Sequence, residues 1–96
     1  MNRQQALATL RKLKPQLVER FGVTRLALFG STVRDEARPG SDIDIVVAFD
    51  APATSAKYFG VQFFLEDELG APIDLVTEKA IRQELRAFIE REAVNV

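Results

Sequence analysis

Asp42 and Asp44 are the residues whose type and spacing most directly suggest chemistry, because they stand two positions apart at the start of the apolar run Ile43–Phe49. Side chains alternate between the two faces of a strand, so both carboxylates are expected on one face. Two anions at such close range repel each other unless a cation lies between them. Carboxylate oxygens and substrate phosphates are ligands that suit Mg²⁺. The pattern therefore predicts a magnesium site, unless Asp42 only caps a turn and Asp44 is exposed on an edge strand.

A third carboxylate, that of Asp74, lies inside the short apolar segment Ile73–Val76. Aspartate is depleted in strands, so its presence there needs a reason. If this segment pairs beside the strand that begins after Asp42, Asp74 completes a group of three carboxylates. The alternative is an aspartate that faces solvent on an edge strand.

Gly30 and Ser31 follow the apolar run Leu26–Phe29, and ten residues separate them from Asp42. A junction between a strand and a helix presents free backbone N–H groups, and a glycine lets a ligand approach the backbone closely. The serine hydroxyl adds one more donor. The pair predicts a phosphate-binding loop, although an ordinary turn or helix cap has the same residues.

Three arginines are candidates to contact a phosphate. Arg34 follows the Gly–Ser pair and could steady the phosphates, but a surface ion pair with Asp35 or Glu36 explains it equally well. Arg82 and Arg86 stand four residues apart in the predicted last helix, so they share one face. They could reach a triphosphate or a partner, or simply face solvent.

The elements that must position these side chains follow from the apolar periodicity of the sequence. Their order predicts a small α/β domain with one sheet. The predicted elements are a helix over 3–20, strands over 26–29 and 43–49, a helix over 55–69, a strand over 73–76 and a last helix capped by Thr77.

Two of these helices carry a specific expectation. Pro15 has no N–H to donate and should kink or split the first helix near 13–14, before Gly22 ends it. In the last helix, four apolar residues recur at helical spacing and should form its buried face: Ile81, Leu85, Phe88 and Ile89. The tail 93–96 is compatible with a terminal strand or a frayed end.

Composition narrows the chemistry further. The chain has no cysteine and no histidine, which excludes disulfides, thiolate metal sites and histidine bases. Its net charge of −1 conceals seven Lys/Arg and one acid over 1–34, and two Lys/Arg and ten acids over 35–78. An acidic centre beside basic residues suits a metal–phosphate ligand, although solvated helix faces give the same distribution.

The length of 96 residues predicts a single domain over 1–96. No signal-peptide run and no stretch of about 18 consecutive apolar residues is present, so neither membrane contact nor export is expected, and the predicted location is cytoplasmic. No helix-turn-helix and no acid-free basic stripe is recognisable, so direct nucleic-acid binding is not expected.

The pattern of Gly30–Ser31, ten residues, Asp42–Ile43–Asp44 and a later Asp74 resembles the minimal nucleotidyltransferases. Their fold is similar to that of the polymerase-beta catalytic domain. The resemblance covers essentially the whole chain. It implies an α/β (α+β) fold in which a single small mixed β-sheet is packed by helices.

Residues around this pattern extend the resemblance. Arg34, the segment 41–47 and the closing helix that leads to Glu92–Ala93–Val94 are also similar to that class. One departure is Asp35, where many members have glycine. It places an extra acid near the predicted phosphate loop.

The resemblance implies a nucleotidyltransferase that uses ATP and two Mg²⁺ ions. Gly30 and Ser31 would hold the β- and γ-phosphates, with Arg34 as a further candidate. The implied catalytic residues and metal ligands are Asp42, Asp44 and Asp74, of which the last also helps to deprotonate the attacking hydroxyl. Such transfer depends on positioning and charge neutralisation, so histidine is not required.

The resemblance further implies an antitoxin that transfers AMP to a hydroxyl, that of a tyrosine, on a partner HEPN-domain RNase toxin, in a hetero-oligomer. A transferase this short needs a partner to supply the acceptor. The alternatives are a non-catalytic module that neutralises its partner by occlusion, or a catalytic subunit that modifies a small molecule. One helix is more aromatic than a single face can bury, so part of it could contact a partner unless all four residues lie in the core: Tyr58, Phe59, Phe63 and Phe64.

Overall fold

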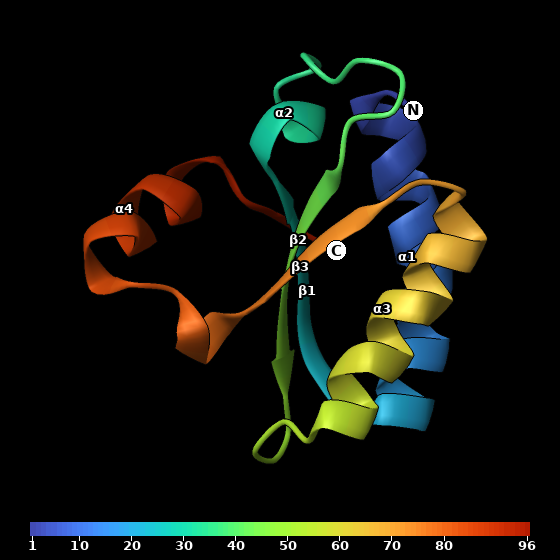
Figure 1. Cartoon of the computed structure of the whole chain (residues 1–96), viewed down its shortest axis with the longest axis vertical. Coiled ribbons are helices and arrows are strands. Elements are labelled where there is room, and N and C mark those ends of the chain that lie inside the picture. Colours follow the sequence, from blue (N-terminus) through green and yellow to red (C-terminus); the bar gives the residue numbers. More distant parts are fainter.

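A computed structural model describes all 96 residues and contains one four-stranded sheet in the order β3-β2-β1-β4 (Figure 1). Strands β1 and β2 pair antiparallel, β1 and β4 pair antiparallel, and β2 and β3 pair parallel. The predicted small mixed sheet packed by helices is therefore confirmed. Its elements are α1 (Arg3–Phe21), β1 (Val23–Phe29), α2 (Gly30–Val33), β2 (Ile43–Phe49), α3 (Ser55–Leu69), β3 (Ile73–Thr77), the 3₁₀ helix η1 (Glu78–Ala80), α4 (Gln83–Glu92) and β4 (Val94–Asn95).

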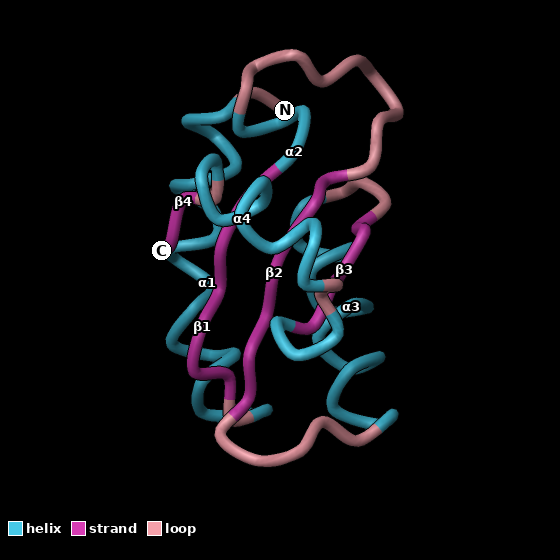
Figure 2. The backbone as a smooth tube through the Cα atoms, turned by 90° about the vertical axis from the view of Figure 1, so that its left-hand side faces the viewer, coloured by secondary structure: helices cyan, strands magenta, loops and turns pink.

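The two faces of the sheet are covered differently. Helices α1 and α3 lie together on one face, and α4 lies over the other (Figures 1 and 2). A core of 17 buried residues fills the space on the α1–α3 face. On the α4 face the buried apolar cluster has only three members: Ala27, Val46 and Ile81. The larger core therefore stabilises the fold from one side and leaves the other side of the sheet available for polar side chains.

Helix α1 runs through Pro15 without a break, so of the kink or split predicted near 13–14 the split is wrong. Proline removes one backbone hydrogen bond, but five α1 side chains are buried in the core and hold the helix together: Ala6, Leu7, Leu10, Leu13 and Leu17. The predicted C-terminal cap is confirmed, because Gly22 adopts the left-handed conformation with φ of 71°.

Helix α3 covers the free edge of β3 with polar side chains four residues apart. The Tyr58 hydroxyl donates to the Leu75 carbonyl at 2.5 Å, and Glu66 Oε2 accepts from the backbone N–H of Ile73 at 3.4 Å. Gln62, between them on the helix, reaches the Ile73 carbonyl. An edge strand whose backbone groups are covered in this way does not offer a free edge for pairing.

The predicted cap of the last helix is wrong, and only part of its predicted buried face is confirmed. Thr77 leads into η1 without a side-chain cap hydrogen bond, and α4 begins only at Gln83. Ile81 is buried before the helix starts, whereas Leu85 and Phe88 are 49% and 57% exposed. Within α4 itself only Ile89 of the predicted stripe packs against the cluster of Ala27, Val46 and Ile81, because that cluster is small. The open question about the tail is settled, because Val94 and Asn95 pair with β1.

No helix combines the length and the apolar composition that crossing a membrane requires.

Candidate active site

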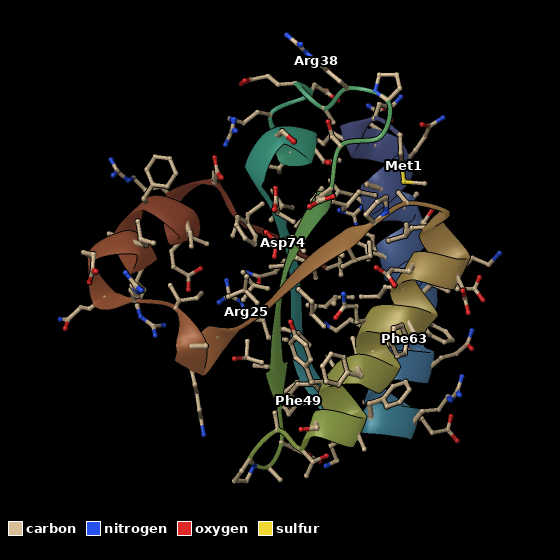
Figure 3. All side chains as sticks on the ribbon, in the orientation of Figure 1. Met1, Arg25, Arg38, Phe49, Phe63 and Asp74 are labelled. Carbon is tan, nitrogen blue, oxygen red and sulfur yellow. The ribbon has the colours of Figure 1, made fainter.

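The register of β2 and β3 brings two of the predicted acidic residues together. Asp44 and Asp74 are direct neighbours across the parallel pair, and the alternation of each strand directs them to the face away from the core. Figure 3 shows Asp74 on the α4 side of the sheet, opposite α3. Residues far apart in the sequence thus form one carboxylate pair, which contains two of the three carboxylates that the sequence predicted to lie together.

This pairing changes the acidity of Asp44. Partial burial raises its pKa to about 6, and a hydrogen bond with Asp74 and the negative charges of Asp74 and Asp42 act in the same direction. The cation of Arg34 opposes the shift. A carboxyl that ionises this reluctantly near neutral pH is one whose charge a bound cation would stabilise.

Asp42 lies just before β2 and is exposed. Although its charge acts on Asp44, no three acidic side chains converge in this structure as a group that could hold a metal ion. The donor set at the sheet is therefore the Asp44–Asp74 pair. Two carboxylate side chains fit Mg²⁺, which commonly takes one or two carboxylates and completes its coordination with water and substrate phosphates.

Gly30 connects the predicted phosphate loop to this pair. Its φ is 74°, in the left-handed region that favours glycine. A Cβ atom at this position would overlap the Asp44 carboxylate, with Asp44 Cγ only 2.8 Å away. Glycine is therefore required here for two independent reasons. Gly30 opens the short helix α2, and Ser31 follows in its first turn, half-buried.

Arg34, at the end of α2, is paired on two sides. Its Nε donates to Glu36 at 3.1 Å, and its Nη1 donates to Glu92 at 2.7 Å. The ion pair with Glu36 matches one of the two alternatives for this arginine, and the ion pair with Glu92 was not predicted. Arg34 still borders the Asp44–Asp74 pair closely enough for its charge to lower the pKa of Asp44.

Position 35 has an aspartate where the resemblance implies a glycine, and the backbone there still adopts the conformation that glycine favours. Its backbone adopts φ of 57°, the conformation that glycine favours and aspartate tolerates better than most residues. Its Oδ1 accepts a hydrogen bond from the backbone N–H of Arg3 at 2.8 Å, in the first turn of α1. The extra acid thus caps a helix, so its carboxylate is engaged outside the Asp44–Asp74 pair.

Sequence reasoning missed Glu92 as a site residue. Its carboxylate accepts from the Gly30 backbone N–H at 2.8 Å as well as from Arg34. Glu92 was visible only as part of the closing segment that resembles other family members, because a glutamate at a helix end carries no chemical signal of its own. The other two candidate arginines make no hydrogen bond with these site residues. Arg86 donates to the Glu78 carbonyl, and Arg82 is exposed.

A mixed sheet with an acidic pair beside a glycine-led turn defines the class of minimal nucleotidyltransferase folds, and comparison with known proteins places the chain there. The family model described as a nucleotidyltransferase domain matches residues 10–96. The chain therefore belongs to the nucleotidyltransferase domain family, and the predicted enzyme class is confirmed.

Individual relatives give a more specific comparison than the family model. The chain is 39% identical over 83 residues to protein adenylyltransferase MntA of Thermococcus cleftensis, which covers 86% of this chain and 84% of the relative. It is also 39% identical over 88 residues to a candidate protein adenylyltransferase of Methanocaldococcus jannaschii, with coverage of 91% and 90%. The predicted resemblance to minimal nucleotidyltransferases is therefore confirmed.

Solved structures share the fold. A structure described as a candidate minimal nucleotidyltransferase superposes with a TM-score of 0.84 at 34% identity, covering 100% of this chain and 97% of that one. A toxin–antitoxin structure with AMP-PNP gives 0.69 at 21% identity, covering 99% and 72%. The MNT antitoxin complex with a tri-AMPylated HEPN toxin of Shewanella oneidensis gives 0.60 at 20% identity, covering 98% and 67%.

Proposed function

We propose that this protein is an antitoxin that transfers AMP from ATP to a tyrosine hydroxyl of a partner HEPN-type toxin and thereby neutralises it. The observation that carries the proposal is the Asp44–Asp74 pair directly beside Gly30, because it combines a cation site with a phosphate loop. The names of the relatives support protein as the acceptor class.

Each site residue has a role in this reaction. Asp44 and Asp74 would hold Mg²⁺, and the exposed side chain of Asp42 would turn toward them as a further ligand. The Gly30 N–H is bonded to Glu92, so the Ser31 hydroxyl and the N–H groups that follow Gly30 would bind the terminal phosphates. When bound, Mg²⁺ neutralises the triphosphate and stabilises the charge that develops during transfer.

The transfer forms a bond between the attacking oxygen and the α-phosphorus and breaks the bond to pyrophosphate. Asp74 is more exposed than its neighbour Asp44 and can accept the proton of the attacking hydroxyl on a carboxylate oxygen. The chain has no histidine to serve as a base, and a carboxylate near a bound phosphate suffices for this step.

Pure occlusion is the second candidate, and one surface feature favours it. Phe59 and Phe63 on α3 stack with ring centroids 6.1 Å apart and are 49% and 59% exposed. Tyr58 and Phe64 instead pack against the core, so only half of the aromatic cluster is available to a partner. Exposed stacked aromatics are a common part of protein interfaces.

Intact-mass spectrometry separates the two candidates. The purified protein is mixed with the HEPN partner, ATP and Mg²⁺, and the partner is expected to gain the mass of one or more AMP groups. A partner that gains no mass but loses its RNase activity would favour occlusion. Replacing the partner's acceptor tyrosine with phenylalanine should abolish the adduct, which tests the acceptor directly.

A further inference from the structure

Glu92 connects the end of α4 to two groups of the phosphate loop at once. One carboxylate oxygen accepts from the Gly30 backbone N–H at 2.8 Å, and the other accepts from Arg34 Nη1 at 2.7 Å. Gly30 is the residue at which a Cβ atom would overlap the Asp44 carboxylate, and Arg34 is the cation whose charge lowers the pKa of Asp44. A single side chain thus contacts both the backbone donor and the charged donor of the loop.

The position of Glu92 is fixed by the chain on both sides of it. The Ala93 N–H donates to the Ile89 carbonyl at 2.9 Å and closes the helix, and Val94 then pairs with Leu28 of β1. The Glu92 side chain is only 19% exposed. It therefore behaves as a fixed contact and not as a mobile lid.

The contacts leave part of the Arg34 guanidinium available. Nη1 donates to Glu92 and Nε donates to Glu36, while Nη2 makes no hydrogen bond within the chain. Holding two nitrogens of a planar guanidinium fixes the direction of the third. A carboxylate that orients an arginine in this way acts on a ligand without touching it, as outer-shell residues do in metal sites.

We propose that Glu92 is a positioning residue for the nucleotide: it fixes the Gly30 backbone and aims Arg34 Nη2 at the triphosphate. This inference rests on the proposed function, because it assigns Glu92 to the same site. It makes the C-terminal segment, α4 with β4, part of the active site rather than a cover for the sheet.

The same helix provides a matched control. Glu90 also ties α4 to the sheet through an arginine, because Arg25 donates to its two oxygens at 2.8 and 2.6 Å. Arg25 also bonds Glu78 and Asn95, so this second bridge anchors α4, η1 and β4 without touching the phosphate loop. Figure 3 shows Arg25 between the sheet and α4. A role of Glu92 in anchoring alone would make the two glutamates equivalent.

The test compares E92Q and E92A with E90Q and E90A in the full-length protein. The readouts are the KM for ATP, the kcat of transfer to the HEPN partner, and Tm. E92A is expected to raise KM by about 10- to 100-fold while kcat stays within about threefold. E92Q retains an acceptor for Gly30 and loses the charge that holds Arg34, so its rise in KM should be smaller, about tenfold. E90Q and E90A should leave KM within about twofold, whatever their loss of Tm.

Equal KM values for the Glu92 and Glu90 variants at matched Tm would overturn the inference, and so would a lower KM in E92A. The amide hydrogen exchange of Gly30 gives a readout that needs no nucleotide. The N–H should be protected in wild type and E90A and exchange freely in E92A, and protection that survives in E92A would contradict the contact itself.

Failure of the inference is distinguishable from failure of the proposed function. A wild-type protein that neither binds AMP-PNP with Mg²⁺ nor modifies its partner contradicts the proposed function, and with it any role of Glu92 in nucleotide binding. Normal wild-type transfer with unchanged KM in E92A contradicts the role of Glu92 alone.

Discussion

The two faces of the sheet have opposite chemistry although they share the same strands. In β2, Ile43, Ile45 and Val47 enter the core of 17 residues beneath α1 and α3. The residues between them face α4, and one of them is Asp44 beside Asp74. The α1–α3 face is closed by apolar packing, whereas the α4 face combines a small apolar cluster with the ion pairs Arg25–Glu90 and Arg34–Glu92.

The α1–α3 face provides most of the apolar burial that stabilises this small domain, and the α4 face carries the candidate catalytic carboxylates. Apolar burial on one face contributes about 25 cal/mol for each Å² removed from water, which offsets unfavourable charge on the other. The paired carboxylates destabilise the metal-free fold, as the raised pKa of Asp44 indicates. The following predictions test whether the two faces are as independent as this division implies.

The largest effect is expected at the acidic pair. The double variant D42N/D44N should lower the rate of AMP transfer at least about 1000-fold, because the cation loses two carboxylate ligands. Its Tm should stay within a few degrees of that of the wild type, since neither side chain belongs to the core. The control D67N/E68Q makes the same change in charge on the exposed surface of α3 and should transfer normally. Transfer by D42N/D44N at the wild-type rate would show that the metal assignment is wrong.

The next largest effect compares the helices on the two faces. Leu65 of α3 is fully buried, so Leu65→Ala should lower the free energy of unfolding by about 3 kcal/mol. Leu85 of α4 is 49% exposed, so Leu85→Ala should lower it by less than about 0.5 kcal/mol. Urea denaturation measures both values. Similar losses for the two variants would mean that α4 carries as much of the core as α3.

A smaller effect follows from the pKa of Asp44. Because this pKa is raised from 3.8 to about 6 on folding, Asp44 favours the native state at low pH, and that contribution is lost as the pH rises through about 6. Asp44→Asn removes the titration, so without Mg²⁺ its Tm should match wild type near pH 4 and exceed it above pH 6 by about 4 °C. Only a modest gap is expected, because Asp44 is half-exposed and solvent screens its charge.

Mg²⁺ supplies the control for this pH series. A saturating concentration at pH 7 should raise the Tm of wild type and not that of Asp44→Asn, so the Tm difference between the two proteins should disappear. A Tm difference between the two proteins that does not vary with pH would contradict the assigned shift of Asp44.

An effect of similar size is expected at Asp35, in the loop outside both faces. Asp35→Ala loses the hydrogen bond to the Arg3 N–H and places alanine in the left-handed region, which should cost about 1 kcal/mol. Asp35→Gly loses the same hydrogen bond without backbone strain, so its cost should be about half as large. Chemical denaturation compares the two variants, and an Asp35→Gly loss greater than that of Asp35→Ala would contradict this account.

Local patterns predicted the elements whose apolar residues all face one core. Strand β2 was placed over 43–49 from its β-branched residues and the turn residues around them and is found there, and the helix over 55–69 ends at a glycine as expected. The start of the last helix was predicted wrongly, because the spacing of its apolar residues does not show which of them contact the sheet. Ile81 is buried before the helix begins, while Leu85 and Phe88 face outward.

Some contacts of the candidate site also follow from local sequence patterns, and others do not. The strand pattern predicted that Asp44 and Asp74 would lie together if their strands paired, because side chains alternate between the two faces of each strand. Glu92 could not be found, because its role depends on where α4 ends relative to the turn at Gly30. The capping role of Asp35 could not be predicted either, because the Arg3 N–H that bonds to it is 32 residues away in the sequence and is brought close only by folding.

The sequence by itself determined the class of enzyme, the three candidate aspartates, the Gly–Ser turn and the alternation that separates a core face from an acidic face. These depend on residue type and on short-range periodicity, which the chain carries locally. Only the tertiary structure decided that Asp44 and Asp74 are neighbours while Asp42 stands exposed, and that Glu92 holds Gly30 and Arg34. These facts depend on the register of strands and on where a helix ends, which long-range packing fixes and local sequence does not record.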